Sequence, residues 1–308
     1  QLHPHTWQHD RNESAVNLSF ALADSLWGPF ARNEFMQNAL LASSLVAIIC
    51  AIAGTYVVLR GLSFVGDALA HGVIPGIALA LLFGIPGVVG AAVGALVMMG
   101  GVSVITTRVR LSADTAIGLL FVGMLSLGVI ITSRSTSFVG DITRILFGEL
   151  LGVTHADLAW QSVVLVLVAA IAFIAHRPFV LMSLDDGLAR TSGFSVTFFH
   201  GLMLTMVAMA VVGSFQLVGT LLVLGLLVAP AATGALLARR VSTMMLVASV
   251  CGVMSSYVGL LTSYHFDVAA GASIVFTSVY MFVLVAVVTI PRRMRGASEL
   301  PHQHEHGH

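Results

Sequence analysis

The sequence predicts an all-α integral membrane protein, a polytopic bundle of eight or nine transmembrane helices. Hydrophobic residues make up 57% of its 308 residues, charged residues only 9%, and the mean hydropathy is +0.98. A soluble domain carries roughly 25% charged residues, so this chain lacks the charge to face water on every side. Its 14 arginines balance 14 acidic residues, and it has no lysine. That balance excludes a nucleic-acid-binding protein, which needs a sustained positive face.

Long stretches without Arg, Asp or Glu divide the chain into spans. A helix needs about 20 apolar residues to cross a bilayer core of about 30 Å. The two longest uncharged stretches, 68–107 and 191–238, can therefore each hold two crossings. The turn signal Gly84-Ile85-Pro86-Gly87 divides the first, and Gly213-Ser214 is a weaker break in the second. The nine predicted spans are 36–59, 66–84, 87–106, 115–133, 158–175, 196–212, 215–237, 243–263 and 270–290.

The arginines predict the orientation. If the first span runs from outside to inside, ten arginines fall inside and four outside, in agreement with the positive-inside rule. The N-terminus is then outside and the C-terminus cytoplasmic. The inside group is Arg60, Arg108, Arg110, Arg177, Arg190, Arg239, Arg240, Arg292, Arg293 and Arg295, and the outside group is Arg11, Arg32, Arg134 and Arg144.

The remaining segments complete the predicted domain organisation. Residues 1–35 form an extracytoplasmic extension in which Trp27 and Phe30 suit a segment lying on the outer membrane surface. Residues 36–291 form the transmembrane domain, and 292–308 form a cytoplasmic, histidine-rich tail. Within the transmembrane domain, residues 138–152 have apolar side chains at helical intervals, which favours a short amphipathic helix near the outer surface.

Glycine pairs inside the spans indicate close helix packing. Gly72 and Gly76, like Gly90 and Gly94, have the spacing that lets two helices approach closely. Pro75 lies in the same region and frees a backbone carbonyl that a neighbouring group must satisfy. We interpret the glycines as packing contacts, and the proline either as an interruption of the kind that is common in transporters or as an inert kink.

Asp67 and His71 are the candidate metal ligands. An Asp and a His four residues apart project from one helix face, and both lie at the start of the second predicted span. Ionisable side chains inside a membrane are costly and usually face a cavity. A carboxylate oxygen and an imidazole nitrogen suit a divalent transition metal, although two ligands are too few for a closed site. The alternative is that Asp67 caps the helix and His71 is a buried, hydrogen-bonded side chain.

The cytoplasmic loop contains a second candidate site. Asp185 opens a short predicted helix, Leu188 and Ala189 form a small apolar face, and Gly193 ends the helix. Such a helix between spans can dock a peripheral partner, and the alternative is an ordinary connection.

Histidines elsewhere have two interpretations. The tail residues His302, His304, His306 and His308 lie in a polar segment of the kind that captures zinc, nickel or copper. A solvated tail without function is the alternative. His155, His200 and His265 lie near span ends, where we expect structural roles.

Several motifs resemble one known family. The run LRGLSFVGDALAHGVIPGIALA at 59–80 resembles the signature of the metal-type ABC importer permeases, which include zinc, manganese and iron uptake systems. Supporting runs occur in the expected order and cover most of 36–291. They also resemble the anchored-repeat-type subgroup of zinc-type permeases. One departure is Ala269-Ala270, where the family often has a proline before Gly271. The supporting runs are RILFGELLGV at 144–153, DDGLARTSG at 185–193, VGTLLVLGLLVAPAAT at 218–233 and DVAAGASIV at 267–275.

The resemblance implies a type II ABC importer permease of the bacterial plasma membrane that works as a homodimer. It implies transport of zinc or manganese without a permanently bound cofactor, and the histidine-rich ends favour zinc. The partners are an extracytoplasmic metal-binding protein and a dimer of cytoplasmic ATPase subunits, so the chain itself is not an enzyme. Asp67 and His71 match the family's metal-coordinating pair, and Ala189 and Gly193 match its coupling-helix pattern.

Three other functions are weighed against this one. A haem, cobalamin or siderophore permease shares the coupling loop but needs a wide cavity without paired metal ligands. A secondary metal carrier needs neither a docking helix nor an ATPase. If the protein were a membrane scaffold that transports nothing, the free-energy cost of placing Asp67 within the membrane would have no explanation.

Overall fold

The computed structural model describes residues 27–62, 64–109, 111–133, 148 and 150–298. The described residues form helices without a strand, and nine of the helical segments are long and apolar enough to cross a membrane. The prediction of an all-α membrane bundle is confirmed, and the described span bounds lie within a few residues of the predicted ones.

The helices follow one another with short connections. Two brief helical turns, η1 (Ile105–Val109) and η2 (Leu150–Gly152), accompany the longer elements. The α-helices are α2 (Glu34–Leu59), α3 (Phe64–Gly72), α4 (Ile74–Leu82), α5 (Gly87–Val104), α6 (Ala113–Thr132), α8 (His155–Ile174), α9 (His176–Leu184), α10 (Asp186–Thr191), α11 (Val196–Leu237), α12 (Val241–Phe266) and α13 (Ala270–Ser298).

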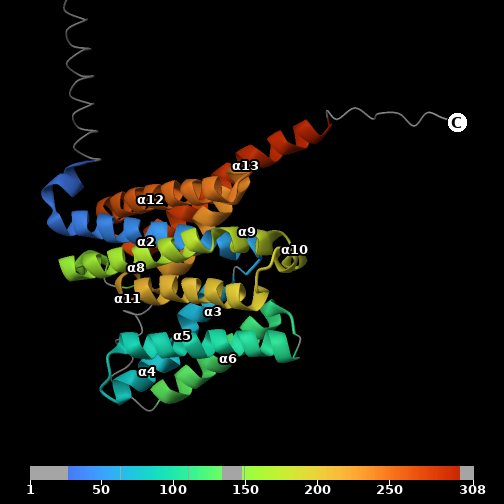
Figure 1. Ribbon diagram of the computed structural model, residues 1–308. Helices are drawn as coiled ribbons and strands as arrows, with labels where there is room; N and C mark the ends of the chain where they lie inside the picture. The colour runs from blue at the N-terminus through green and yellow to red at the C-terminus, as the bar shows by residue number, and fades with distance from the viewer. Residues whose placement is uncertain (1–26, 63, 110, 134–147, 149, 299–308) are drawn as a thin grey trace, which may run out of the picture.

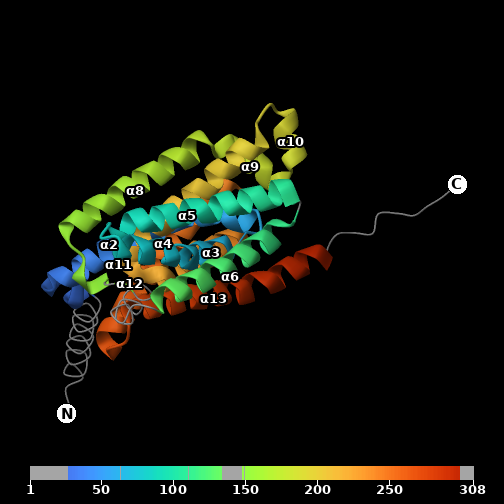
Figure 2. The same cartoon turned by 90° about the horizontal axis from the view of Figure 1, so that it is seen from below.

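The spans lie side by side along one direction (Figure 1), and the described ends of the chain lie at opposite ends of the bundle (Figure 2). The short helices α9 and α10 lie at the end where α13 finishes. α13 continues beyond the predicted ninth span into residues 292–298. The histidines of the predicted tail lie outside the described residues.

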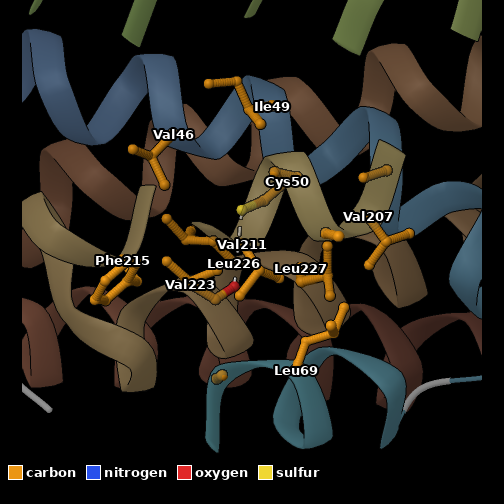
Figure 3. Packing of buried hydrophobic residues seen from close by; sticks show 14 of the residues in the cluster. Val46, Ile49, Cys50, Leu69, Val207, Val211, Phe215, Val223, Leu226 and Leu227 are labelled. Carbon is orange, nitrogen blue, oxygen red and sulfur yellow. Dashed lines mark hydrogen bonds between the residues drawn. The ribbon is translucent and has the colours of Figure 1, made fainter. Parts of the chain in front are cut away.

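α2 is at the centre of the packing. It contacts α8, α11 and α12. Within the most apolar 18-residue stretch of α2, 67% is buried inside the protein, against 17% in the corresponding stretches of α6 and α13. Figure 3 shows Val46 and Cys50 of α2 on the side that faces α11 in the core, where Cys50 Sγ lies 3.7 Å from the carbonyl oxygen of Val223. α6 and α13 therefore have the largest uncovered apolar faces among the described spans.

The break between the sixth and seventh spans was predicted at the wrong glycine. Gly213 is helical and gives room for Val164, while its carbonyl accepts a hydrogen bond from Gln161 Nε2 at 3.1 Å. The chain breaks instead at Gly219, whose φ of 76° lies in the region that favours glycine. Figure 3 shows Val207 and Val211, from before this kink, beside Leu226 and Leu227, from after it.

The predicted glycine contacts are confirmed at the crossing of α4 and α5. A Cβ at Gly76 would overlap the carbonyl oxygen of Gly90, and one at Gly90 would overlap that of Gly76. A Cβ at Gly94 would lie 3.1 Å from Cα of Val73. The absence of side chains at these positions lets the two backbones touch.

The N-terminal extension is described only from residue 27. Trp27 is exposed, as expected of a side chain at the membrane surface. Phe30 is buried within this chain and stacks on Tyr257 of α12 with ring centroids 5.1 Å apart, and the predicted place of this segment at the membrane surface stays a prediction. Most of the predicted amphipathic helix at 138–152 lies outside the described residues.

Candidate metal site and docking helix

The candidate metal ligands lie on a divided membrane helix. The second span consists of α3 and α4, which are separated at Val73. Pro75 is in the first turn of α4, where its missing N–H is tolerated. Asp67 and His71 are both on α3, immediately before the division. Such interruptions at membrane depth occur where the backbone lines a cavity or is buried in protein.

Asp67 and His71 contact each other. His71 Nδ1 lies 3.1 Å from the carbonyl oxygen of Asp67 and 3.3 Å from its carboxylate Oδ1. If Nδ1 carries the proton and donates it here, the lone pair of the neutral imidazole is on Nε2. A hydrogen bond of this kind orients metal-binding histidines in other sites. The pair can therefore present a carboxylate oxygen and Nε2 to one cation.

The pair lies on the uncovered face of α3. The side chains of Asp67 and His71 are 35% and 26% exposed, and Phe64 and Ile74 on the same face are also incompletely buried. The intervening residues pack into the bundle. In the alternative interpretation Asp67 is the helix cap, but α3 begins at Phe64, so Asp67 lies within its first turn. His71 is partly buried and hydrogen-bonded, as that alternative expects, and the metal-binding role of the pair stays a prediction. This face carries the only polar groups of α3 other than its backbone.

His71 is also fixed from the side by an aromatic ring. Phe121 of α6 meets the imidazole edge to face, with ring centroids 5.5 Å apart and planes at 85°. Sequence reasoning did not identify Phe121, because nothing in its surroundings separates it from other apolar residues of the fourth span. The contact holds the imidazole plane without using either nitrogen.

Within the described residues, no group of three or more His, Cys, Asp or Glu side chains is placed to hold a metal ion. Asp67 and His71 thus form two ligands of an incomplete site. A cation there needs ligands from water, from another chain or from a second copy of this one. Incomplete coordination suits an ion in transit, which has to leave as well as bind.

The predicted docking helix is α10. Asp185 is its N-cap, accepting hydrogen bonds from the backbone N–H groups of Gly187 and Leu188. At the other end, Gly193 has a φ of 85°, and the N–H groups of Gly193 and Phe194 donate to the carbonyls of Arg190 and Ala189. These two bonds are a Schellman motif. Both predicted helix ends are therefore where the sequence places them.

The predicted apolar face of α10 divides into two parts. Leu188 is 46% exposed, but Ala189 is fully buried within this chain. Ala189, which is predicted on the face that meets a partner, is buried in a helix that packs on α9 and α11, and its docking role stays a prediction. Leu188 is the apolar group that α10 leaves free for a partner.

Two polar contacts near α10 were not anticipated. Arg60, at the end of α2, pairs with Asp186 of α10, with 3.2 Å between Nη2 and Oδ1. One turn earlier, the Tyr56 hydroxyl lies 2.9 Å from His176 Nδ1. Both contacts join residues more than a hundred positions apart in the sequence. The opposite charges of Arg60 and Asp186 are the only feature of the sequence that could have suggested either contact.

The other span-end histidines do not join the candidate site. His265 Nδ1 bonds the carbonyl oxygen of Leu261 on its own helix at 2.9 Å. His155 is exposed in the first turn of α8, and His200 is partly buried in α11. None of the three forms a metal-binding group with Asp67 and His71 in the described part of the chain.

The described residues form a bundle of membrane-spanning helices, with a candidate pair of metal ligands in one span and a short exposed helix at one end, an arrangement typical of a permease subunit. The chain belongs to the ABC 3 transport family, whose model matches residues 32–289. The family predicted from the sequence motifs is therefore confirmed.

Relatives and a solved structure support the assignment. The manganese import system permease protein ScaB of Streptococcus gordonii is 37% identical over 261 residues, or 84% of this chain and 93% of that protein. The chelated iron transport system membrane protein YfeD of Yersinia pestis is 33% identical over 272 residues, or 88% and 90%. The structure of PsaBC from Streptococcus pneumoniae in complex with Fab has a TM-score of 0.78 and 32% identity, and the match covers 90% of this chain and 100% of that one.

Proposed function

We propose that this chain carries a divalent transition metal, manganese first, through the membrane in an ATP-driven importer. The observation that supports this most directly is the Asp67–His71 pair on the uncovered face of an interrupted membrane helix. A carboxylate with one imidazole can bind manganese, iron(II) and zinc, so the preference for manganese comes from the relatives. Relatives named for manganese and for chelated iron agree with that ligand chemistry. The ion is the transported substrate and is not a resident cofactor.

A second copy of the chain completes the site in this proposal. A charged side chain within a membrane is expensive, yet Asp67 and His71 remain 35% and 26% exposed even though Phe121 of α6 covers one side of the imidazole. Two copies meeting along the face of α3 that bears this pair would bring four ligands around one axis. The homodimer would thus cover the charged pair and supply the ligands that one chain lacks.

The orientation in this proposal follows from the arginines. Alternating crossings bring Arg60, Arg177, Arg190, Arg239 and Arg240 to the end that carries α10. That end is cytoplasmic by the positive-inside rule. A dimer of ATPase subunits would bind there, and an extracytoplasmic metal-binding protein would deliver the ion to the opposite end. The membrane is the bacterial plasma membrane.

Metal competition tests the substrate. The assembled importer, reconstituted with its ATPase and binding protein, should take up radiolabelled Mn²⁺ when ATP is supplied. Unlabelled Mn²⁺ in excess should abolish the signal, and Fe²⁺ should compete partly. Because Zn²⁺ binds imidazole and carboxylate ligands more tightly than Mn²⁺ does, competition by Zn²⁺ is read together with direct uptake of radiolabelled Zn²⁺. Strong competition by Zn²⁺ with direct zinc uptake would replace manganese by zinc. Absence of uptake of all three metals would refute the proposed function.

Leu188→Glu tests the docking role of α10. The exposed apolar side chain should be central to the contact with the ATPase, and such anchors are worth a factor of about ten or more in affinity. We expect the ATPase to be lost during co-purification while the permease keeps its yield. Leu111→Glu is the matched control, since Leu111 is also exposed at that end of the bundle but lies outside α10. Full recovery of the ATPase with Leu188→Glu would contradict the docking role.

A further inference from the structure

The contact between α10 and α2 joins the proposed docking helix to the rest of the bundle by charge. Arg60 Nη2 lies 3.2 Å from Asp186 Oδ1, and the side chains are 14% and 46% exposed. Asp186 is the first residue of α10, and Arg60 is the C-cap of α2. Among the described residues, this is the one ion pair between α10 and a membrane-spanning helix. A displacement of α10 therefore either moves the Arg60 side chain or breaks its ion pair with Asp186.

Arg60 has little freedom to exchange Asp186 for another partner. Its Nη1 is buried without a hydrogen-bond partner among the described residues, as is the nearby His200 Nδ1. A guanidinium in such surroundings loses its compensating charge if Asp186 moves away, and that loss is costly. The Tyr56–His176 hydrogen bond lies one turn before Arg60 and joins the same end of α2 to α9. The last turn of α2 is thus held by both cytoplasmic helices.

A fixed turn connects Arg60 to the candidate metal ligands. The N–H groups of Gly61 and Leu62 donate to the carbonyls of Val58 and Val57 at 3.1 and 2.9 Å, which is a Schellman motif with Gly61 at a φ of 67°. Leu62 is buried, and its carbonyl accepts from the N–H of Val65 at 2.9 Å, already within α3. α3 then leads to Asp67 within its first turns. The residues described on both sides of position 63 are hydrogen-bonded, and only that position separates Leu62 from α3, so we expect α3 to follow the end of α2.

We propose that Arg60 is a positioning residue that transmits movement of α10 to α3 and thereby to Asp67 and His71. This inference rests on the proposed function, since it presumes that an ATPase moves α10. The ion pair connects three elements that are distant in the sequence: the docking helix, the end of α2 and the metal-bearing helix. Because Arg60 lies on α2, outside both α10 and the Asp67–His71 pair, its removal should leave both binding events intact.

The test is a charge-pair cycle in the assembled importer. The variants are Asp186→Asn, Arg60→Gln and the exchanged pair Arg60→Asp with Asp186→Arg. Three quantities are measured for each: co-purified ATPase, radiolabelled Mn²⁺ bound by the purified complex, and Mn²⁺ imported per ATP hydrolysed in proteoliposomes. Asp114→Asn is the matched control, because Asp114 is an exposed carboxylate at the start of α6 and outside both candidate sites.

Each single substitution should lower the import per ATP by roughly 2- to 30-fold, the range found for residues that couple distant sites. Bound Mn²⁺ and co-purified ATPase should stay at the wild-type level, and the exchanged pair should recover import relative to either single variant. If Arg60→Gln reduces the yield of folded protein, Arg60→Lys replaces it, because lysine keeps the charge but loses the guanidinium geometry.

Other results would overturn the inference. Wild-type import per ATP in Asp186→Asn would show that the pair transmits nothing. A loss of import that parallels loss of the ATPase would assign Asp186 to docking instead. Additive single effects without recovery in the exchanged pair would show that the two residues act separately. A wild-type complex that hydrolyses ATP but imports no metal would refute the proposed function itself, independently of these variants.

Discussion

Asp67→Asn is expected to reduce Mn²⁺ uptake about 100-fold or more, and His71→Gln to have an effect of the same order. Loss of a residue that only orients a metal ligand already costs about 10- to 100-fold in affinity or activity, and here the ligand itself is lost. Both substitutions nearly preserve side-chain size. Both positions are also partly exposed, so the packing of α3 should survive.

The two variants should fail in different ways. Asp67→Asn keeps the backbone carbonyl that His71 Nδ1 contacts at 3.1 Å, so the imidazole stays oriented while the negative charge is lost. His71→Gln keeps the charge and removes the imidazole nitrogen. Uptake and Mn²⁺ binding are measured at matched protein levels, with Asp114→Asn and His155→Gln as controls at exposed positions. Wild-type uptake by both variants would exclude the pair from the ion path.

Gly54→Ala is expected to have the largest effect on folding. A Cβ at this position in α2 would overlap the carbonyl oxygen of Leu227 and lie 2.9 Å from its carbonyl carbon. Both are backbone atoms of α11, so no side chain can rotate away, and overpacking of this kind costs about 1–3 kcal/mol or more. We expect a low yield of monodisperse protein and a thermal midpoint well below that of the wild type, measured by size-exclusion chromatography after heating.

Gly123→Ala is the matched control for this substitution. Gly123 is an exposed position in the middle of α6, and a Cβ there would meet no described atom within 4 Å. Replacing glycine by alanine inside a helix contributes about 1 kcal/mol in favour of the helix. The control should therefore fold as well as the wild type or better. Equal stability of Gly54→Ala and Gly123→Ala would contradict the close contact of α2 with α11.

The spans could be predicted because a membrane leaves so few positions for charge. Gaps between charged residues delimit the crossings, and the turn at 84–87 is marked by glycine and proline together. The kink at Gly219 could not be chosen over Gly213 by composition. It depends on the contact with Gly148, where a Cβ would lie 2.5 Å from the backbone nitrogen of Gly219. A glycine's conformation is set by its neighbours in space.

The candidate sites show the same division between local and distant information. The spacing of Asp67 and His71 predicted a shared face because four residues complete about one helical turn. The caps of α10 could likewise be predicted from neighbouring residues in the sequence, because Asp185 precedes the helix and Gly193 follows it. The burial of Ala189 and the partner of Arg60 depend on how distant helices pack. Neither follows from periodicity or spacing.

The central place of α2 also has a consequence for biogenesis. Its main contacts are with α11 and α12, which are synthesised only after more than a hundred further residues. Until residues 196–266 enter the membrane, the surface around Gly54 has to face lipid or temporary neighbours. Incomplete chains of this length expose packing surfaces and are prone to misassembly. During that interval, before α11 and α12 cover α2, cellular quality control can still recognise the exposed surface of α2.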